Sequence, residues 1–514
     1  MDHASEIWVK GTLCLLGLLA FLWRTRGASP LPRGKAGQLL GVAAFVAVLA
    51  YANFGVFHGR GYVHHWETFH YVLGSKYFPE LGYDGLYAAS VRAEIEGTGN
   101  QQLPANLRDL RTNEVVPTRT LEWQMGEVKR RFTPERWRAF VADNRHFLES
   151  NDPVYLARIR TDHGYNPTPA WTFVARLFDG WLPVGETTLG LWAAIDPLLL
   201  AVAFVLVFRT FGSLAGTLAL VVFGLGYPWR FDWVGGAFLR QDWFAAVLVA
   251  VCMVKKERYA TAGALLGYAV SVRLFPAAFF FGPAVLAVRA VVKKEDMAWL
   301  RRLALGAALS IALGLAAGSL TGRGTSAWAD FGRNFQKHRA AWLTNNVGLK
   351  NTLLYGPETF ERRLVDFALP EPWTRWQRKM DEMEAGRKPL LALAALVFLG
   401  MVAVAAWRAD RTEAVLLGIP AVFAAGVLTC YYWVMLAAVP IARRSWLVAG
   451  TLALSIGLFA LDLATPTFEL IYGAMSWLLL LLFVAWAVDL AGGVSGRPSS
   501  GSGYSRGRRT KRGR

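Results

Sequence analysis

The sequence predicts an all-α polytopic membrane protein with about 12–13 transmembrane helices and two long extracytoplasmic loops that carry short helices. Of the 514 residues, 54% are hydrophobic and 18% are charged, which is too apolar for a soluble chain of this length. The apolar residues come in blocks, and a helix that crosses a bilayer needs about 20 mostly apolar residues. The net charge of +18 is concentrated in short connections between these blocks.

The apolar blocks give thirteen candidate spans. In chain order they lie at 7–23, 37–57, 186–208, 212–228, 241–254, 259–273, 275–291, 303–320, 388–407, 413–430, 431–442, 445–462 and 468–490. The blocks at 241–254 and 431–442 are short enough to be half-helices or re-entrant segments. The first block lacks a basic start and a small-residue cleavage site, so we interpret it as a span and not as a signal peptide.

These spans and the polar stretches between them divide the chain into six segments. They are N-terminal transmembrane helices at 1–57, a first extracytoplasmic loop at 58–185, a central transmembrane bundle at 186–320, a second extracytoplasmic loop at 321–387, C-terminal transmembrane helices at 388–491 and a basic, disordered cytoplasmic tail at 492–514.

The positions of Lys and Arg set the expected orientation. The connections at 24–36, 255–258, 289–302 and 443–444 and the tail are basic, and with the spans above all of them lie on the cytoplasmic side. We therefore expect a multi-pass protein of the cell (inner) membrane with both long loops outside and the C-terminal tail inside. The basic charge is then a topology signal, and we expect membrane lipids, not nucleic acid, as its partner.

The sequence does not indicate a metal or a cofactor. The three cysteines, Cys14, Cys252 and Cys430, lie inside apolar runs, so we expect neither a disulfide nor a metal cluster. It contains no Gly-rich phosphate loop followed by Lys-Ser/Thr, no His-x-x-x-His pattern and no carboxylate-rich metal box. No cytoplasmic segment is large enough to form a nucleotide-sugar domain.

The first long loop opens with a segment rich in aromatic, imidazole and acidic side chains. Glu67 is three residues from both His64 and His70, so the three side chains can share one face of a helix. A carboxylate beside aromatic and imidazole groups at a lipid–water boundary is partly desolvated, which raises its pKa and suits a general base. The alternative is that Glu67 caps or pairs within an interfacial helix.

The layout of this segment resembles the GT-C superfamily of integral-membrane glycosyltransferases. The matching residues are Glu67, Tyr71, Gly82, Leu86 and Tyr87. The resemblance is closest to the polyprenyl-phosphate-mannose-dependent mannosyltransferase branch, and it implies that a first-loop carboxylate deprotonates the acceptor hydroxyl. Because Glu67 stands where Asp is usual, Asp84 is a second candidate for the base. The alternative for Asp84 is a structural role in a Tyr-Asp-Gly-Leu turn.

Two arginines are candidates for binding the donor phosphate. Arg240 precedes Asp242 at an outer helix start, where a guanidinium could hold a lipid phosphate. Arg273 lies between two apolar runs, and ionisable residues at membrane depth tend to face a cavity or a partner. The alternatives are an interfacial Arg/Asp pair for Arg240 and snorkelling to the surface for Arg273.

The second outer loop and a late span supply the remaining candidates, on a looser resemblance to the same superfamily. His338 could stabilise the phosphate leaving group as a cation or as a hydrogen-bond donor. The candidates for binding sugar hydroxyls and phosphate are Asn345, Asn346 and Lys350. The aromatic residues expected at the cavity are His70, Tyr71, Tyr431 and Tyr432. Solvation of His338 and an aromatic belt at a helix start are the alternatives.

These features predict an enzyme, a membrane glycosyltransferase that moves mannose or another hexose or pentose to an extracytoplasmic lipid, glycan or protein acceptor. The donor is expected to be a polyprenyl-phosphate-linked sugar, because an outward-facing transferase cannot reach cytosolic nucleotide sugars. Direct displacement at the anomeric carbon would invert its configuration. The alternative is a multi-pass transporter or lipid flippase, with Asp196 and Asp462 as candidate sites. A third interpretation is a membrane scaffold whose outer loops bind a partner.

Overall fold

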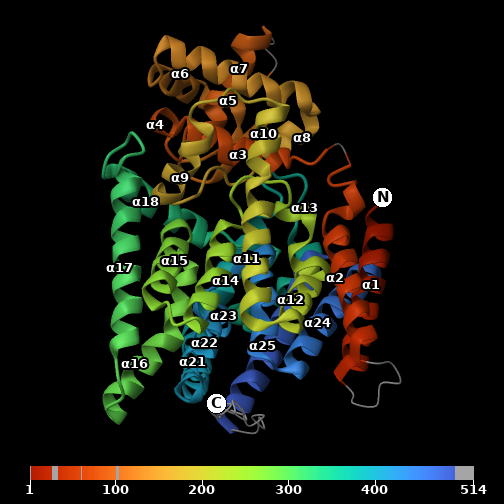
Figure 1. Cartoon of the computed structure of the whole chain (residues 1–514). Coiled ribbons are helices and arrows are strands. Elements are labelled where there is room, and N and C mark those ends of the chain that lie inside the picture. The colour runs from red at the N-terminus through yellow and green to blue at the C-terminus, as the bar shows by residue number, and fades with distance from the viewer. Residues whose placement is uncertain (1, 26–32, 60, 100–102, 493–514) are drawn as a thin grey trace, which may run out of the picture.

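The computed structural model describes residues 2–25, 33–59, 61–99 and 103–492. In this part of the chain the protein is mostly helical, with two short two-stranded sheets. A bundle of long helices carries a layer of shorter helices over one end (Figure 1). The basic tail expected at 492–514 lies outside the described residues, apart from Gly492.

Among the described residues, seven helices are long and apolar enough to cross a membrane. They are α1 (His3–Thr25), α10 with α11 (Glu186–Phe211), η4 with α16 (Phe275–Lys293), α17 (Ala298–Ser319), α21 (Thr374–Arg408), α24 (Ser445–Ala464) and α25 (Phe468–Gly492). An eighth candidate is α12 (Ser213–Leu225) with the segment Tyr227–Val234, which bends by 65° at the break between them. The protein is therefore an all-α, multi-pass membrane protein, as the apolar blocks predict.

The expected 12–13 transmembrane helices are not all present as helices of spanning length. The shorter apolar segments are α2 (Arg33–Tyr51), α14 (Asp242–Lys255), α15 (Tyr259–Val272) and η6 (Cys430–Ala442). The block expected at 413–430 is broken into α22 (Arg411–Leu416), α23 (Gly418–Ala425) and a strand, β4 (Leu428–Thr429). Most residues of α14, α23 and η6 are buried against other helices, and a buried segment is as apolar as a lipid-facing one.

The described residues of the first long loop, 58–59, 61–99 and 103–185, fold into the layer that covers one end of the bundle, and we name this layer the cap. Its helices are α3 (His65–Lys76), α4 (Phe78–Leu81), α5 (Leu86–Thr98), α6 (Glu122–Arg130), α7 (Pro134–Ser150), α8 (Pro153–Ile159) and α9 (Pro169–Asp179). Thr133, Asp152 and Thr168 begin three of these helices, because each side chain accepts a backbone N–H bond and is followed by proline. A hairpin of β1 (Asn106–Asp109) and β2 (Glu114–Pro117) completes the cap.

The second long loop lies at the same end of the bundle as the cap. It contains α18 (Ser326–Ala340), β3 (Asn346–Val347), α19 (Leu349–Leu354), η5 (Pro357–Thr359) and α20 (Glu361–Leu364). Strand β3 pairs antiparallel with β4, with Asn346 opposite Thr429, so the loop is tied to the end of the broken 413–430 block. The remaining short elements are η1 (Asn53–Gly55), η2 (Thr118–Leu121), η3 (Tyr227–Trp229) and α13 (Phe231–Val234).

Basic connections gather at the opposite end of the bundle. Arg444 pairs with Glu413 at 2.9 Å and with Asp489 at 2.6 Å, which joins η6, α22 and α25. Lys255 and Arg443 line one small pocket at this end, so the connections after α14 and η6 are neighbours. The C-terminal end of α16 lies at this end too, away from the cap (Figure 1).

Candidate active site

A cavity of about 1130 Å³ lies where the cap, the second loop and the bundle meet. The cap contributes His58, residues 61–67, His146, residues 150–152, Tyr155, Asp162 and His163, and the second loop contributes residues 342–345, Glu371, Trp373 and Gln377. The bundle side is formed by Asp232, Trp233, Thr429, Tyr431 and Phe468. Ligand pockets in proteins commonly measure about 300–1,000 Å³, so this cavity has room for a ligand of several rings.

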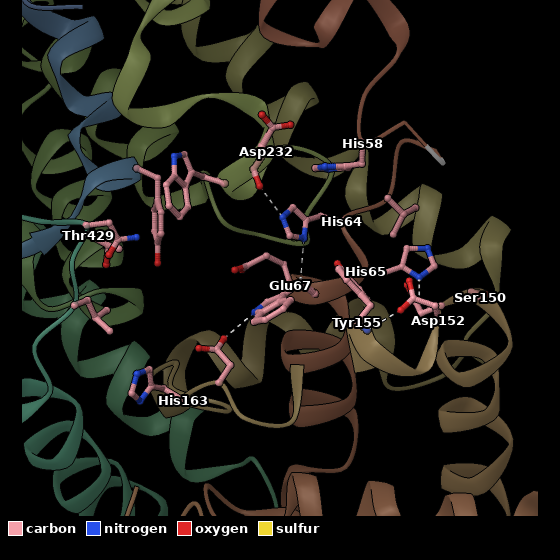
Figure 2. A pocket seen from close by; sticks show the side chains of 18 of the residues that line it. His58, His64, His65, Glu67, Ser150, Asp152, Tyr155, His163, Asp232 and Thr429 are labelled. Carbon is pink, nitrogen blue, oxygen red and sulfur yellow. Dashed lines mark hydrogen bonds between the residues drawn. The ribbon is translucent and has the colours of Figure 1, made fainter. Parts of the chain in front are cut away.

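Glu67 reaches this cavity from the first turn of α3. His64 caps the helix, because its Nδ1 accepts the backbone N–H of Glu67 at 3.3 Å. The other ring nitrogen of His64 lies 2.9 Å from the carbonyl oxygen of Asp232, which ties the start of α3 to α13. The side chain of Glu67 extends into the cavity beside His64 (Figure 2). His64 therefore begins the helix, and Glu67 in its first turn directs a carboxylate into the cavity.

Arg240 lies directly behind Glu67. Its Nε is 2.7 Å from Glu67 Oε2, although the N–H does not point at the oxygen, so the contact is an ion pair without an aligned hydrogen bond. The guanidinium donates to the hydroxyl of Tyr71 and, at 3.1 Å, to that of Tyr431. It also stacks 4.2 Å from the centre of the Tyr71 ring. Burial raises the pKa of Glu67, and the positive charge of Arg240 offsets only part of this rise.

Asp196 of α11 holds the loop that carries Arg240 in place. One carboxylate oxygen of Asp196 accepts the backbone N–H of Arg240 at 2.6 Å and that of Gln241 at 3.0 Å. Leu239, just before them, has a φ of 51°, so the chain turns sharply at this point. Asp196, a candidate site of the transporter alternative, therefore holds the loop in place in this structure.

Arg273 lies deeper than Arg240 and is only 7% exposed. Its guanidinium carbon lies 5.9 Å from the centre of the Tyr71 ring and 5.6 Å from that of Trp171. One nitrogen donates to the carbonyl oxygen of Val272, whereas Nε and Nη2 have no hydrogen-bond partner among the described residues. Arg273 is not among the residues that line the cavity, and it reaches toward the site from behind Tyr71.

Asp84, the second candidate base, lies away from the cavity lining. Its Oδ1 is 3.4 Å from Nη1 of Arg131, and its side chain is 36% exposed. Its backbone carbonyl accepts a hydrogen bond from Gln124. The structure thus places Asp84 in an exposed turn with a basic partner, which matches the structural alternative for this residue.

His338 lies beside His163 and outside the cavity lining, with 6.0 Å between the two ring centres. Burial, and then the charges of His163 and Lys337, lower the pKa of His338 to about 3. The ring is therefore neutral at pH 7. This argues against the expected role as a cation and leaves the role of a neutral hydrogen-bond donor.

The other candidates of the second loop divide into two groups. Asn345 lines the cavity, whereas Asn346 is buried in β3 and is absent from the lining. Lys350 forms an ion pair with Glu384 of α21, so its charge is already neutralised outside the cavity. Asn346 and Lys350 therefore lie outside the cavity lining, and their binding of the donor stays a prediction.

The expected aromatic residues surround the Arg240 ion pair. Tyr431 lines the cavity, and its ring centre is 4.6 Å from that of Tyr432. His70 is buried behind Glu67, with one ring nitrogen 2.8 Å from the Trp66 carbonyl oxygen and the other 2.7 Å from the Tyr87 hydroxyl. The structure therefore brings together residues predicted from four separate segments. They are Glu67, His70, Tyr71, Arg240, Arg273, Tyr431 and Tyr432.

Several lining residues were not predicted, and the Asp162–His163 pair is the clearest. Trp66 donates its indole N–H to Asp162 at 2.7 Å, close to Glu67. Burial would raise the pKa of Asp162, but His70, His163 and the hydrogen bond from Trp66 outweigh it and leave the pKa lowered. The only signal in the sequence was that an acid, Asp162, and an imidazole, His163, are adjacent after α8. Their nearness to Glu67 could not be predicted, because they are far from it along the chain.

The described part of the chain contains no group of three or more His, Cys, Asp and Glu side chains placed to hold a metal ion. What the site offers chemically is a desolvated carboxylate at a large cavity, an arginine that orients it and a second buried arginine with free donors. Comparisons of the chain with protein-family models, with curated proteins and with solved structures found no match in any of the three.

Proposed function

We propose that the protein is an inverting membrane glycosyltransferase that moves a sugar from a polyprenyl-phosphate-linked donor to an extracytoplasmic lipid, glycan or protein acceptor. The observation that carries the proposal is the position of Glu67, a mostly buried carboxylate on the wall of a cavity of about 1130 Å³ with Arg240 and Arg273 behind it. The GT-C resemblance of the sequence around Glu67 supports the same function. A mannose or another hexose or pentose is the expected sugar.

In this mechanism Glu67 takes the proton of the acceptor hydroxyl. The acceptor oxygen then forms a bond to the anomeric carbon while the bond from that carbon to the phosphate oxygen breaks. The bonding electrons go to the departing lipid phosphate, and attack from the opposite face inverts the anomeric configuration. The proton stays on Glu67, and the negative charge leaves with the phosphate.

The two arginines have different roles in this proposal. Arg240 is occupied by Glu67, Tyr71 and Tyr431, so it positions the base. Among the described residues, Nε and Nη2 of Arg273 have no hydrogen-bond partner beside the Tyr71 ring, and Arg273 is the group that binds the donor phosphate. A fixed guanidinium in a buried site stabilises a developing phosphate charge more strongly than it would in water.

In the same proposal the membrane is the cell (inner) membrane, with the cap and the second loop on its extracytoplasmic side. The gathering of Arg443, Arg444 and Lys255 at the end opposite the cap supports this orientation, because basic connections stay on the cytoplasmic side. The donor then reaches Arg273 from the lipid phase and the acceptor enters the cavity from outside.

A transporter or lipid flippase is the second candidate, and one observation favours it. Asp462 of α24 is buried and lies 3.2 Å from Arg230, and the hydroxyl of Tyr227 donates to it at 3.1 Å. Buried ionisable groups within membrane helices commonly mark a transport path.

One pair of assays separates the two functions. The full-length protein in lipid nanodiscs is given radiolabelled polyprenyl-phosphate hexoses and pentoses together with lipid, glycan and protein acceptors. We expect the label to move to an acceptor, with the anomeric configuration inverted as read by NMR of the product. Uptake or flipping of the labelled lipid in proteoliposomes, with no transfer to any acceptor, would contradict the proposal and support transport.

A further inference from the structure

The charge of the cavity wall differs from that of the whole chain. Its described lining contains no Lys or Arg, although the protein carries a net charge of +18. Six carboxylates line it: Glu67, Asp152, Asp162, Glu186, Asp232 and Glu371. Two of these face an arginine outside the lining, since Glu67 pairs with Arg240 and Glu371 pairs with Arg108 at 2.5 Å. Among the described residues, Asp162, Glu186 and Asp232 form no ion pair with Lys or Arg.

The histidines of the lining do not compensate for this negative charge. Burial is the main cause that lowers the pKa of His58, His64 and His163 to about 4. Burial lowers the pKa values of His65 and His146, and the charge of His146 lowers the pKa of His65 further. All five rings line the cavity and are neutral at pH 7, so the wall is negative there.

The same wall carries flat aromatic surfaces on several sides. Trp66 lies in the cap, Trp342 and Trp373 come from the second loop, and Trp233 comes from the bundle. Trp233 packs against Tyr431 with 6.3 Å between ring centres. Aromatic faces pack against the C–H faces of sugar rings, while carboxylate and neutral imidazole groups accept hydroxyl hydrogen bonds.

We propose that this cavity is the acceptor site and that it admits an uncharged or amino-bearing carbohydrate and excludes acceptors with a phosphate or carboxylate near the reacting hydroxyl. That the cavity binds the acceptor rests on the proposed function. That the cavity is negatively charged rests on its lining residues alone. Under this proposal the donor and the acceptor bind at different places. The donor phosphate binds at Arg273, behind Tyr71, and the acceptor binds in the cavity. Two like charges about 10 Å apart at an effective dielectric constant of about 20 change an equilibrium by roughly tenfold.

The charge of the cavity is measured with a single cysteine and two thiol reagents that differ in charge. Thr344→Cys places a thiol in the lining, and the three native cysteines are buried. Thr120→Cys, at an exposed position of η2 in the cap, is the matched control. The reagents are the cationic trimethylammonium-ethyl and the anionic sulfonatoethyl methanethiosulfonate. A change in thiol pKa slows both equally, so the ratio of the two rates reports the local potential.

We expect the cation-to-anion rate ratio at Thr344→Cys to exceed the ratio at Thr120→Cys by about tenfold. Adding Asp162→Asn and Glu186→Gln to Thr344→Cys should bring its ratio close to that of the control. An equal ratio at the two cysteines, or a preference for the anion at Thr344→Cys, would overturn the inference. A high ratio that survives removal of both carboxylates would overturn it as well.

The transfer assay distinguishes this inference from the proposed function. With chitotriose, tri-N-acetylchitotriose and trigalacturonate as cationic, neutral and anionic probes, we expect quenching of tryptophan fluorescence by the first two at concentrations about tenfold lower than by the third. Label transferred efficiently to an acceptor with a carboxylate next to the reacting hydroxyl would refute the inference and leave the transferase standing. Charge selection without transfer to any acceptor would refute the transferase and leave the charge of the cavity standing.

Discussion

Glu67, at the start of α3, and Asp84, in the turn before α5, are carboxylates of the same cap in opposite environments. Glu67 lines the cavity, and its side chain is 13% exposed beside the buried Arg240. Asp84 lies outside the lining with a side chain that is 36% exposed and a surface partner, Arg131. The difference teaches that the surroundings, and not the residue type or its place in a motif, decide how strongly each carboxylate is desolvated.

Exchanging each carboxylate for its amide should separate the two regions most strongly. Glu67→Gln removes the proposed base, and loss of a general base commonly costs between 10² and 10⁴ in rate, so we expect a loss of about a thousandfold. Asp84→Asn breaks an exposed ion pair worth at most about 1 kcal/mol, so transfer should change by less than about twofold. Initial rates of label transfer at saturating donor measure both. Equal losses of transfer rate in Glu67→Gln and Asp84→Asn would show that Glu67 has no role that Asp84 lacks.

Removing the arginine partner of Glu67 should destabilise the protein more than removing the arginine partner of Asp84. Arg240→Ala leaves Glu67 as a buried charge without a cation, which typically costs about 3–5 kcal/mol. Arg131→Ala removes an exposed partner and should cost about 0–1 kcal/mol. Thermal unfolding in detergent compares the two variants, and Arg240→Ala combined with Glu67→Gln should recover part of the loss. A similar midpoint for both single variants would show that the buried pair has no special role.

Arg273 and Lys350, the two cations predicted to bind the donor phosphate, extend the comparison from the base to the donor site. Arg273→Ala removes a buried guanidinium whose Nε and Nη2 have no hydrogen-bond partner in the described part of the chain, and we expect transfer to fall by about a hundredfold. Lys350→Ala removes a cation that Glu384 already neutralises, so it serves as the control and should leave the rate within about threefold. If Lys350→Ala proves the more damaging, the donor phosphate binds at the second loop and not behind Tyr71.

His338 should give the smallest effect. Because its pKa is lowered to about 3, the ring does not titrate between pH 5 and 8 and contributes no positive charge there. His338→Gln keeps a neutral hydrogen-bonding group, so transfer should fall by no more than about threefold and its pH dependence should be unchanged. A pH profile that shifts in His338→Gln would show that the imidazole is charged during the reaction.

The general architecture was predictable because it depends on composition along the chain. Apolar blocks and basic connections indicated a multi-pass helical protein, and the count failed where α14, α23 and η6 are buried among other helices. A short buried segment has the same hydropathy as a lipid-facing span, so only packing distinguishes them.

The site was predictable to the extent that polar side chains stand out at the ends of apolar runs. Glu67, Arg240 and Arg273 were found in this way, and the structure brings them together around Tyr71. The sequence did not indicate the surroundings of residues whose partners come from distant segments. The pairing of Lys350 with Glu384 and the burial of His338 beside His163 leave no trace in the local sequence.

The central claim, that Glu67 is the base, is tested most directly by the pH dependence of single-turnover transfer. A raised pKa keeps Glu67 protonated at higher pH than an ordinary carboxyl group, so activity is present above that pKa and is lost as the pH falls through it. In the wild type we predict that the rate falls about tenfold per pH unit on the acid side, with a midpoint above the usual Glu value of 4.5. In Glu67→Gln the residual rate should show no such acid limb. An acid limb that persists unchanged in Glu67→Gln would contradict the account.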